Sequence, residues 1–239
     1  MTDAVEDRIR QAMTQVEEQA EPEKPSVEGR RPIASRSSDV AKWAAQSLVT
    51  NGVTPNQISW ASMGAAFAAF LLLWGAGSVA NAPGRGLMLL VAAGFVQGRL
   101  ICNLLDGMVA VEGGRAEADG PFWNEFPDRV ADTLILGGLG LAVGHPGLGF
   151  LAAALAVCTA YVRELGRANG APPDFSGPMA KQHRMAAVTG ALVLAAFWPI
   201  WGESGNLVLL VGLWAIVLGT AGTVARRGWT QVEWLRARK

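Results

Sequence analysis

Charged side chains are scarce in this chain of 239 residues, where they make up 17% of the sequence against about 25% in an average soluble domain. The chain has no excess of positive charge, because 20 Lys and Arg balance 20 Asp and Glu, so nucleic acid is not an expected partner. Cysteine is also rare: Cys102 and Cys158 both lie in apolar stretches without a CxxC pattern, which excludes a disulfide framework and a zinc site. The chain has instead 51% hydrophobic residues, 29 Gly and 9 Trp, a composition typical of helices packed in a bilayer.

Stretches without charge predict an all-α fold, a polytopic integral membrane protein with six transmembrane helices. The stretch from Ile58 to Ala80 is long enough to cross roughly 30 Å of hydrocarbon at about 1.5 Å per residue. The other expected spans are Gly86 to Val111, a hairpin of 128–144 and 147–165 around a turn at 144–147, Met185 to Gly202, and Leu207 to Ala225.

The segments around these spans divide the chain into four parts. Residues 1–37 are polar and of mixed charge, which predicts a disordered cytoplasmic tail, and a solvated extension explains them better than a binding element. Residues 38–56 form a juxtamembrane segment in which Val40, Trp43 and Leu48 recur at helical spacing; an interfacial amphipathic helix and a plain approach to the first span both fit. Residues 57–227 are expected to form the membrane domain and residues 228–239 a second cytoplasmic tail.

Lys and Arg are concentrated on one side of the expected membrane. The N-terminal segment carries seven, the loop from 163 to 184 four and the C-terminal tail five, whereas the opposite connections carry only Arg85. Positive residues tend to stay on the cytoplasmic side, so both termini should be cytoplasmic. We expect the protein to lie in the inner (plasma) membrane of a bacterium.

Polar residues at helical spacing interrupt the second and third expected helices. They are Arg99, Asn103 and Asp106 at i, i+4 and i+7, and Asp128 and Asp132 at i and i+4. Pro127 before the second group suits a first-turn position. Carboxylates beside a bilayer are costly and repel one another, so a cation or a basic partner should lie between them. Magnesium, which takes oxygen ligands, meets this demand; a buried ion pair with Arg99 or Arg129 is the purely structural alternative.

These residues resemble the signature of the CDP-alcohol phosphotransferase (CDP-alcohol phosphatidyltransferase) family, D-x2-D-G-x2-A-R-x8-G-x3-D-x3-D. The second Asp, the Gly and the Ala match Asp106, Gly107 and Ala110. The signature is degenerate, because Asn103 stands at the first Asp and Val111 at the Arg.

The rest of the signature aligns in two ways. The x8 spacing puts Gly120 on the second Gly, Asn124 on the third Asp and Asp128 on the fourth. The preferred alignment lengthens the loop by about four residues and takes Asp128 and Asp132 as the third and fourth Asp, which keeps a carboxylate at both positions.

Two further stretches support the resemblance. The run from Gly52 to Ser59 is similar to the TPNxxS/T run before the family's first helix. Four basic residues stand where the family holds the phosphate of an acceptor: Arg163, Arg167, Lys181 and Arg184.

The resemblance implies a membrane transferase of phospholipid biosynthesis. Such an enzyme moves a phospho-alcohol group, here a phosphatidyl group, from a CDP-alcohol to an acceptor hydroxyl with release of CMP, and uses Mg²⁺ or Mn²⁺. The implied metal ligands are Asn103, Asp106, Asp128 and Asp132, and the implied nucleotide-binding residues are Asn103, Asp106, Gly107 and Ala110. Asp132 is the implied catalytic base.

The departures at Asn103 and Val111 keep an alternative open. A non-catalytic relative could bind nucleotide or lipid, or support a partner enzyme, on an inherited scaffold. Three Asp at signature positions favour the enzyme, since a scaffold gives no reason to keep costly carboxylates beside the bilayer. The expected partners are a CDP-linked lipid donor, a polar acceptor alcohol and membrane lipid. The GxxxG patterns at Gly94 and Gly140 indicate close helix packing and also allow a homodimer.

Overall fold

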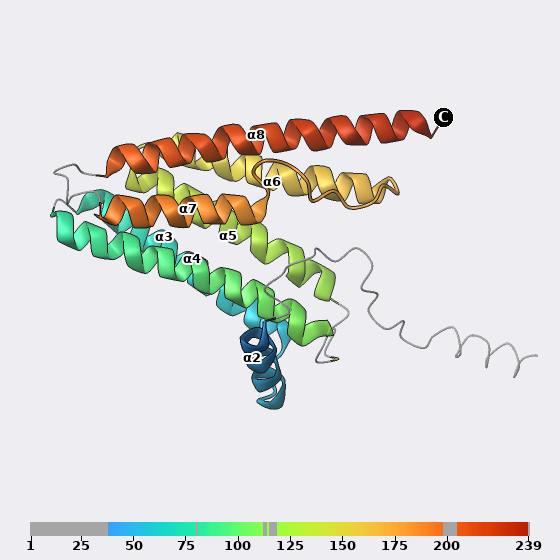
Figure 1. The fold of residues 1–239 in the computed structure, drawn as a ribbon, viewed down its shortest axis with the longest axis horizontal. Coiled ribbons are helices and arrows are strands. Elements are labelled where there is room, and N and C mark those ends of the chain that lie inside the picture. Colours follow the sequence, from blue (N-terminus) through green and yellow to red (C-terminus); the bar gives the residue numbers. More distant parts are fainter. Residues whose placement is uncertain (1–37, 80, 112–113, 115–118, 198–204, 239) are drawn as a thin grey trace, which may run out of the picture. The chain divides into compact units, whose positions relative to one another are not determined.

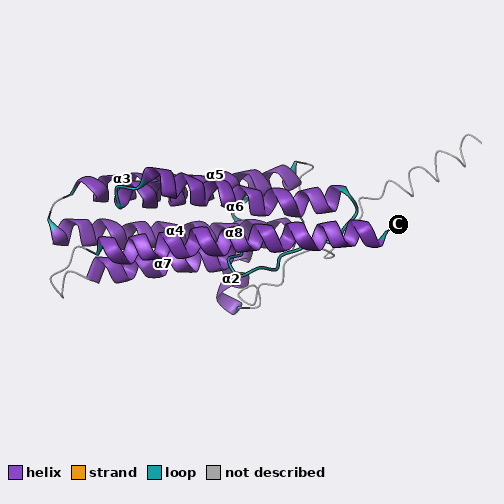
Figure 2. Cartoon of the chain, turned by 90° about the horizontal axis from the view of Figure 1, so that it is seen from above, coloured by secondary structure: helices purple, strands orange, loops and turns teal. Residues whose placement is uncertain are grey.

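The structure is a computed structural model that describes residues 38–79, 81–111, 114, 119–197 and 205–238. Every regular element in these residues is a helix (Figure 2). The helices are α2 (Asp39–Thr50), α3 (Pro55–Ser78), α4 (Ala82–Val111), α5 (Gly120–Ala142), α6 (Pro146–Ala168), α7 (Lys181–Phe197) and α8 (Asn206–Ala237). Within residues 33–239, α3 to α8 run side by side along one direction, and α2 packs against the last part of α4 and runs across that direction (Figure 1).

Four of these helices are long and apolar enough to cross a membrane: α3, α4, α6 and α8. The described part of the chain is therefore all-helical, with four helices that could span a membrane. Helix α7 has 17 described residues, and α5 carries four charged residues in its first half, from Glu125 to Asp132. The expected six spans are thus matched by six long helices in the right order, of which four have the length and composition of a span.

The first long helix begins where the TPN run predicts. Thr54 and Gln57 form a capping box: the Thr54 hydroxyl accepts a hydrogen bond from the Gln57 N–H at 3.3 Å, and the Gln57 side chain accepts one from the Thr54 N–H at 3.1 Å. This reciprocal pair satisfies two of the N–H groups that a helix start leaves without partners. Pro55 follows in the first turn, where its missing N–H costs nothing.

Two boundaries differ from the expectation. Pro127 lies inside α5, so its expected first-turn position is wrong: the helix begins at Gly120, and Pro121 occupies the first turn. Helix α8 continues to Ala237, so most of the expected C-terminal tail is helical (Figure 1). Residues 39–50 are helical, as the interfacial interpretation requires; their position at a membrane surface stays a prediction.

Small residues let the helices pack closely. A Cβ atom added at Gly140 of α5 would lie 2.7 Å from the Cα atom of Gly149 in α6, so the two backbones are in direct contact. Gly140 therefore serves packing within the chain. A Cβ atom at Gly94 or Gly98 would meet no atom within 4 Å, which places that pair on an open face of α4. The homodimer stays a prediction.

Candidate active site

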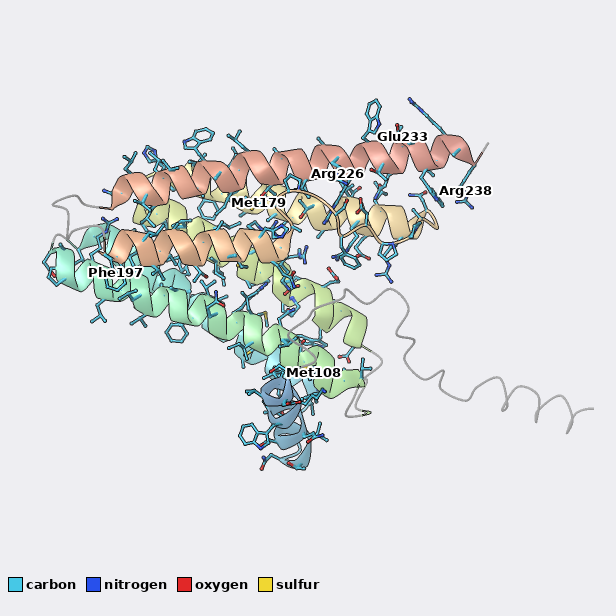
Figure 3. All side chains as sticks on the ribbon, viewed as in Figure 1. Met108, Met179, Phe197, Arg226, Glu233 and Arg238 are labelled. Carbon is cyan, nitrogen blue, oxygen red and sulfur yellow. The ribbon has the colours of Figure 1, made fainter. Side chains whose placement is uncertain are left out.

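The polar residues of α4 and α5 meet residues from the start of α7 in the interior of the helical bundle. Met108 marks one edge of this region, where α4 meets α2, and Met179 marks the other, just before α7 (Figure 3). Most of the expected site residues lie here: Arg99, Asn103, Asp106, Gly107 and Ala110 on α4, Asp128 and Asp132 on α5, and Lys181 and Arg184 on α7.

Asp132 is the most deeply buried carboxylate of the site. Its Oδ2 atom accepts a hydrogen bond from Arg184 Nη2 at 2.6 Å, and Arg99 Nη2 lies 3.5 Å from Oδ1. The side chains of Asp132 and Arg99 are 0% exposed and that of Arg184 is 1% exposed. The group expected to act as a base thus faces two guanidinium groups in this structure.

Asp128 lies one turn earlier on α5 and is held by three cations. Arg99 Nη2 donates to its Oδ1 atom at 2.9 Å. Lys181 Nζ donates to its Oδ2 atom, and Arg129 Nη2 lies 3.6 Å from the same oxygen. The residue is 7% exposed. One oxygen of Asp128 therefore faces a buried arginine and the other faces a lysine and a half-buried arginine.

Asp106 faces this group from α4. Its Oδ2 atom accepts a hydrogen bond from the Ser59 hydroxyl at 3.2 Å, and the N–H of Gly107 donates to its other oxygen. Asp128 and Lys181 act on the Asp106 carboxylate through their charges. Asn103, one turn earlier, is half-buried. The two helices thus bring Asp106, Asp128 and an ammonium group into one small region.

The carboxylates of α5 have counter-charges within the chain, so basic partners do lie beside them. Ion pairs join ten residues into one network: Arg184, Asp132, Arg99, Asp128, Lys181, Arg129, Glu125, Arg163, Glu164 and Arg167. Six of them are cations and four are carboxylates, so the network has an excess of two positive charges. The structural alternative of ion pairs with Arg99 and Arg129 is present in this fold.

The four basic residues expected to form one anion pocket fall into two groups. Lys181 and Arg184 pair with the Asp residues of α5. Arg163 donates to Glu125 at 2.6 Å and to Glu164 at 2.8 Å, and Arg167 lies on Glu164 at 3.2 Å with a side chain that is 57% exposed. Each of the four is therefore in an ion pair.

Residues 169–180, the strap between α6 and α7, are hydrogen-bonded to α8. Arg227, 5% exposed, donates to the carbonyl of Ser176 in the strap and to that of Thr159 in α6, both at 2.9 Å. The Met179 N–H donates to the Thr223 hydroxyl at 3.0 Å. These contacts fix the start of α7, and with it Lys181 and Arg184, against α6 and α8.

The strap also touches the outer part of the ion-pair network. Arg163 lies over the ring of Phe175 at 5.3 Å. Burial raises the pKa of the neighbouring Asp174 carboxyl, but hydrogen bonds from Ser176 and the nearby charge of Arg227 outweigh it, so this pKa lies below its usual value. The strap carboxylate is thus held in its charged form.

Sequence reasoning missed the burial of Arg227 and the pairing of Glu125 with Arg163. Arg227 counted only as a positive residue of the tail, although Thr220, Thr223 and Arg227 fall at i, i+3 and i+7, and all three are buried. That polar stripe in an apolar helix was the available signal. The ion pair of Glu125 with Arg163 could not be found by spacing, because Arg163 belongs to another helix.

The site offers few ligands to a divalent ion. Among the residues that the structure describes, no group of three or more His, Cys, Asp or Glu lies close enough to hold an ion. Two carboxylates, Asp106 and Asp128, and the amide oxygen of Asn103 are nevertheless the hard oxygen ligands that Mg²⁺ and Mn²⁺ take. The ammonium group of Lys181 already places a cation on Asp128. The residues fit one divalent ion if Lys181 gives up the Oδ2 atom.

Comparison with known proteins shows which enzymes this chain is similar to. No family model matches the chain. Phosphatidylinositol phosphate synthase of Streptomyces avermitilis is 28% identical over 196 residues, which span 75% of this chain and 72% of that protein. The fold is similar to the crystal structure of Mycobacterium tuberculosis phosphatidylinositol phosphate synthase with CDP-DAG bound, with a TM-score of 0.67 and 20% identity over 81% of this chain and 94% of that one. The chain is thus similar to phosphatidylinositol phosphate synthases, enzymes of the CDP-alcohol phosphatidyltransferase family whose signature it resembles.

A second crystal structure of the Mycobacterium tuberculosis synthase, in complex with manganese and citrate, gives a TM-score of 0.66 and 21% identity, covering 80% of this chain and 88% of that one. Within the family signature, Asp106, Gly107 and Ala110 lie near the end of α4. Gly120, which the x8 spacing puts on the signature's second Gly, is the first residue of α5. The signature therefore extends from the last turns of α4 to the first turns of α5.

Proposed function

We propose that this chain is a membrane transferase that moves a phosphatidyl group from a CDP-linked lipid to a hydroxyl of a phosphorylated polyol, with release of CMP. The observation that carries the proposal is the pairing of Asp128 with Lys181 and of Asp132 with Arg184 inside an apolar helical bundle, with Asp106 buried on the neighbouring helix α4. A reaction that brings two phosphate-bearing substrates together needs carboxylates to hold a metal ion and basic side chains to bind phosphate. The name of the relatives supports a phosphorylated acceptor.

The donor end of the site is assigned to α4 and the metal. Asp106 and Asp128, with the amide oxygen of Asn103, hold Mg²⁺ or Mn²⁺, and Gly107 and Ala110 leave room for the nucleotide beside them. When bound, the ion supplies positive charge that neutralises the diphosphate. The manganese complex of the structural neighbour supports this choice of ion.

The acceptor end is assigned to the basic residues. Lys181 and Arg184 bind the acceptor's phosphate, and Arg163 and Arg167 extend the positive surface from α6. Buried N–H groups without a hydrogen-bond partner support a role in binding anions: Nε and Nη1 of Arg99, Nε of Arg129 and Nε of Arg184. An anionic oxygen would satisfy donors that are costly to leave unpaired.

Asp132 is the proposed base. It accepts the proton of the acceptor hydroxyl, whose oxygen attacks the β-phosphorus of the donor; the bond to the CMP oxygen breaks, and CMP leaves with the electron pair. In the described arrangement Arg184 holds the Oδ2 atom of Asp132. The acceptor's phosphate would compete for Arg184 and so free that oxygen, which ties proton transfer to acceptor binding.

We assign six spans to the chain. Both termini then lie in the cytoplasm, and the protein lies in the inner membrane of a bacterium. Helices α5 and α7 complete the six, because each runs beside a helix with the composition of a span. The membrane domain comprises residues 57–227, preceded by the juxtamembrane helix and a polar N-terminal tail. A homodimer through the open face around Gly94 is part of this proposal.

The experiment is direct. Purified protein in lipid vesicles is incubated with CDP-diacylglycerol, Mn²⁺ and a panel of phosphorylated and unphosphorylated polyols, and released CMP is measured. We expect CMP with a phosphorylated polyol, and replacement of Lys181 and Arg184 by Ala should weaken acceptor binding more than nucleotide binding. No CMP from any acceptor would support the second candidate, a non-catalytic relative, which is favoured by Asn103 and Val111 at signature positions.

A further inference from the structure

We propose that Lys181 couples the metal half of the site to the acceptor half, because it can serve either Asp128 or an anionic ligand but not both. Divalent metal displaces the Lys181 ammonium group from Asp128 and thereby makes it available to a phosphate or sulfate oxygen. This inference rests on the proposed function. It predicts that metal and anion strengthen each other's binding.

The contacts of Asp128 show why Lys181 is the cation that must move. The Oδ1 atom is bound by Arg99 at 2.9 Å, and Arg99 is fully buried and also lies on Asp132. Arg99 therefore has no free space into which it can withdraw. The Oδ2 atom is bound by Lys181, so this oxygen is the one that a metal ion can take.

Lys181 is also placed to move. It is the first residue of α7, directly after the strap, and its side chain is 17% exposed. Its long flexible stem carries a single ammonium group that can turn to a new partner without shifting the backbone. Arg184, one turn further on, is 1% exposed and is fixed by Asp132 and by the Met179 carbonyl.

The charge of the network decides what Lys181 does after release. Asp132, the other buried carboxylate nearby, is already held by Arg99 and Arg184. Arg129, half-buried beside Asp128, is shared with Glu125. The excess of two positive charges in the network already includes Lys181, and a bound divalent ion would add two more. An anion restores the balance, which is the source of the coupling.

Linkage makes the coupling reciprocal: whatever factor the anion adds to metal affinity, the metal adds to anion affinity. Removing the ammonium group should strengthen metal binding, whereas the loss of a merely structural contact would weaken it. Without Lys181, metal no longer competes for Asp128 and binds more tightly in the absence of anion. At the same time, anion no longer improves metal binding.

The test measures Mn²⁺ binding by the paramagnetic resonance signal of free Mn²⁺, using the full chain in detergent, with and without sulfate. In the parent protein sulfate should lower the dissociation constant of Mn²⁺ by about 5-fold or more, the low end of ordinary coupling between two sites. Lys181→Met should bind Mn²⁺ more tightly than the parent without sulfate and show no sulfate effect. Lys181→Arg should restore part of the effect.

One control variant and one substitute variant complete the Mn²⁺ binding test. Lys42→Met makes the same change on the exposed side of α2 and should behave as the parent protein does. Lys181→Gln, which keeps a polar side chain, replaces Lys181→Met if the latter does not fold. Weaker Mn²⁺ binding in both Lys181 variants, or a sulfate effect that survives in them, overturns the inference.

CMP release separates this inference from the proposed function. If the parent releases CMP but sulfate leaves Mn²⁺ affinity unchanged, the coupling is wrong and the transferase stands. If sulfate and Mn²⁺ are coupled through Lys181 but no acceptor yields CMP, the transferase is wrong and the coupling stands. Absence of Mn²⁺ binding in the parent overturns the coupling.

Discussion

Replacing Asp132 by Asn should destabilise this protein more than any change in the outer ion pairs. The substitution keeps the shape of the side chain but removes the carboxylate that faces Arg99 at 3.5 Å and Arg184 at 2.6 Å. Both guanidinium groups are almost fully buried, so water cannot take over the role of the lost charge.

The expected cost follows from that burial. Breaking a buried ion pair by removing one partner costs about 3–5 kcal/mol, because a buried charge is left uncompensated. For a protein of this size, each 1 kcal/mol shifts the unfolding midpoint by roughly 2–4 °C, which gives a fall on the order of 10 °C. Glu164→Gln is the matched control, since the Glu164 side chain is itself 40% exposed, Arg167 is 57% exposed and Arg163 keeps Glu125 as a second partner; it should cost about 0–1 kcal/mol.

Thermal unfolding in detergent, followed by the fluorescence of the nine Trp, measures both variants. The reasoning is refuted if Asp132→Asn unfolds at the midpoint of the parent protein. It is refuted equally if Glu164→Gln loses as much stability, because burial would then not decide the cost. High salt should leave the loss at Asp132 unchanged, since buried pairs are poorly screened.

Two further predictions concern packing and the metal ligands. Gly140→Ala should cost about 1–3 kcal/mol in thermal unfolding, because its Cβ atom would lie 2.7 Å from the Gly149 backbone, whereas Gly94→Ala, with no atom within 4 Å, should be neutral. Equal midpoints for the two variants would contradict the close contact of α5 and α6. Asn103→Asp should lower the Mn²⁺ concentration needed for half-maximal CMP release, because it adds a negative ligand. Loss of activity in that variant would mean that the amide donates a hydrogen bond that a carboxylate cannot.

Much of the helical layout could be predicted from the sequence, because the length of an uncharged run decides whether a helix can span a bilayer. The TPN run indicates the start of α3, since Thr, Pro and Gln are residue types that favour a helix start. The start of α5 was harder to place. Gly120 and Pro121 belong to a polar loop by composition, and helical periodicity becomes visible only from Asp128 onward.

Spacing identified the faces of the site but not the partners across them. The i, i+4 pattern places Asp128 and Asp132 on one face of a helix, yet their partners Lys181 and Arg184 lie more than fifty residues further along the chain. Which cation meets which carboxylate depends on how helices pack, and no local rule gives that. The sequence therefore predicted the carboxylates and the basic residues as separate groups, whereas the fold joins them.

The most direct test of the central claim is CMP release by the full chain in lipid vesicles with CDP-diacylglycerol and Mn²⁺, comparing one polyol with and without its phosphate. We expect release with the phosphorylated polyol and little with the other, because only an anion can compete for Arg184 and so free the Oδ2 atom of Asp132. Asp106→Ala should abolish the release. Equal release from both polyols would contradict the acceptor site, and no release from either would contradict the assignment as a transferase.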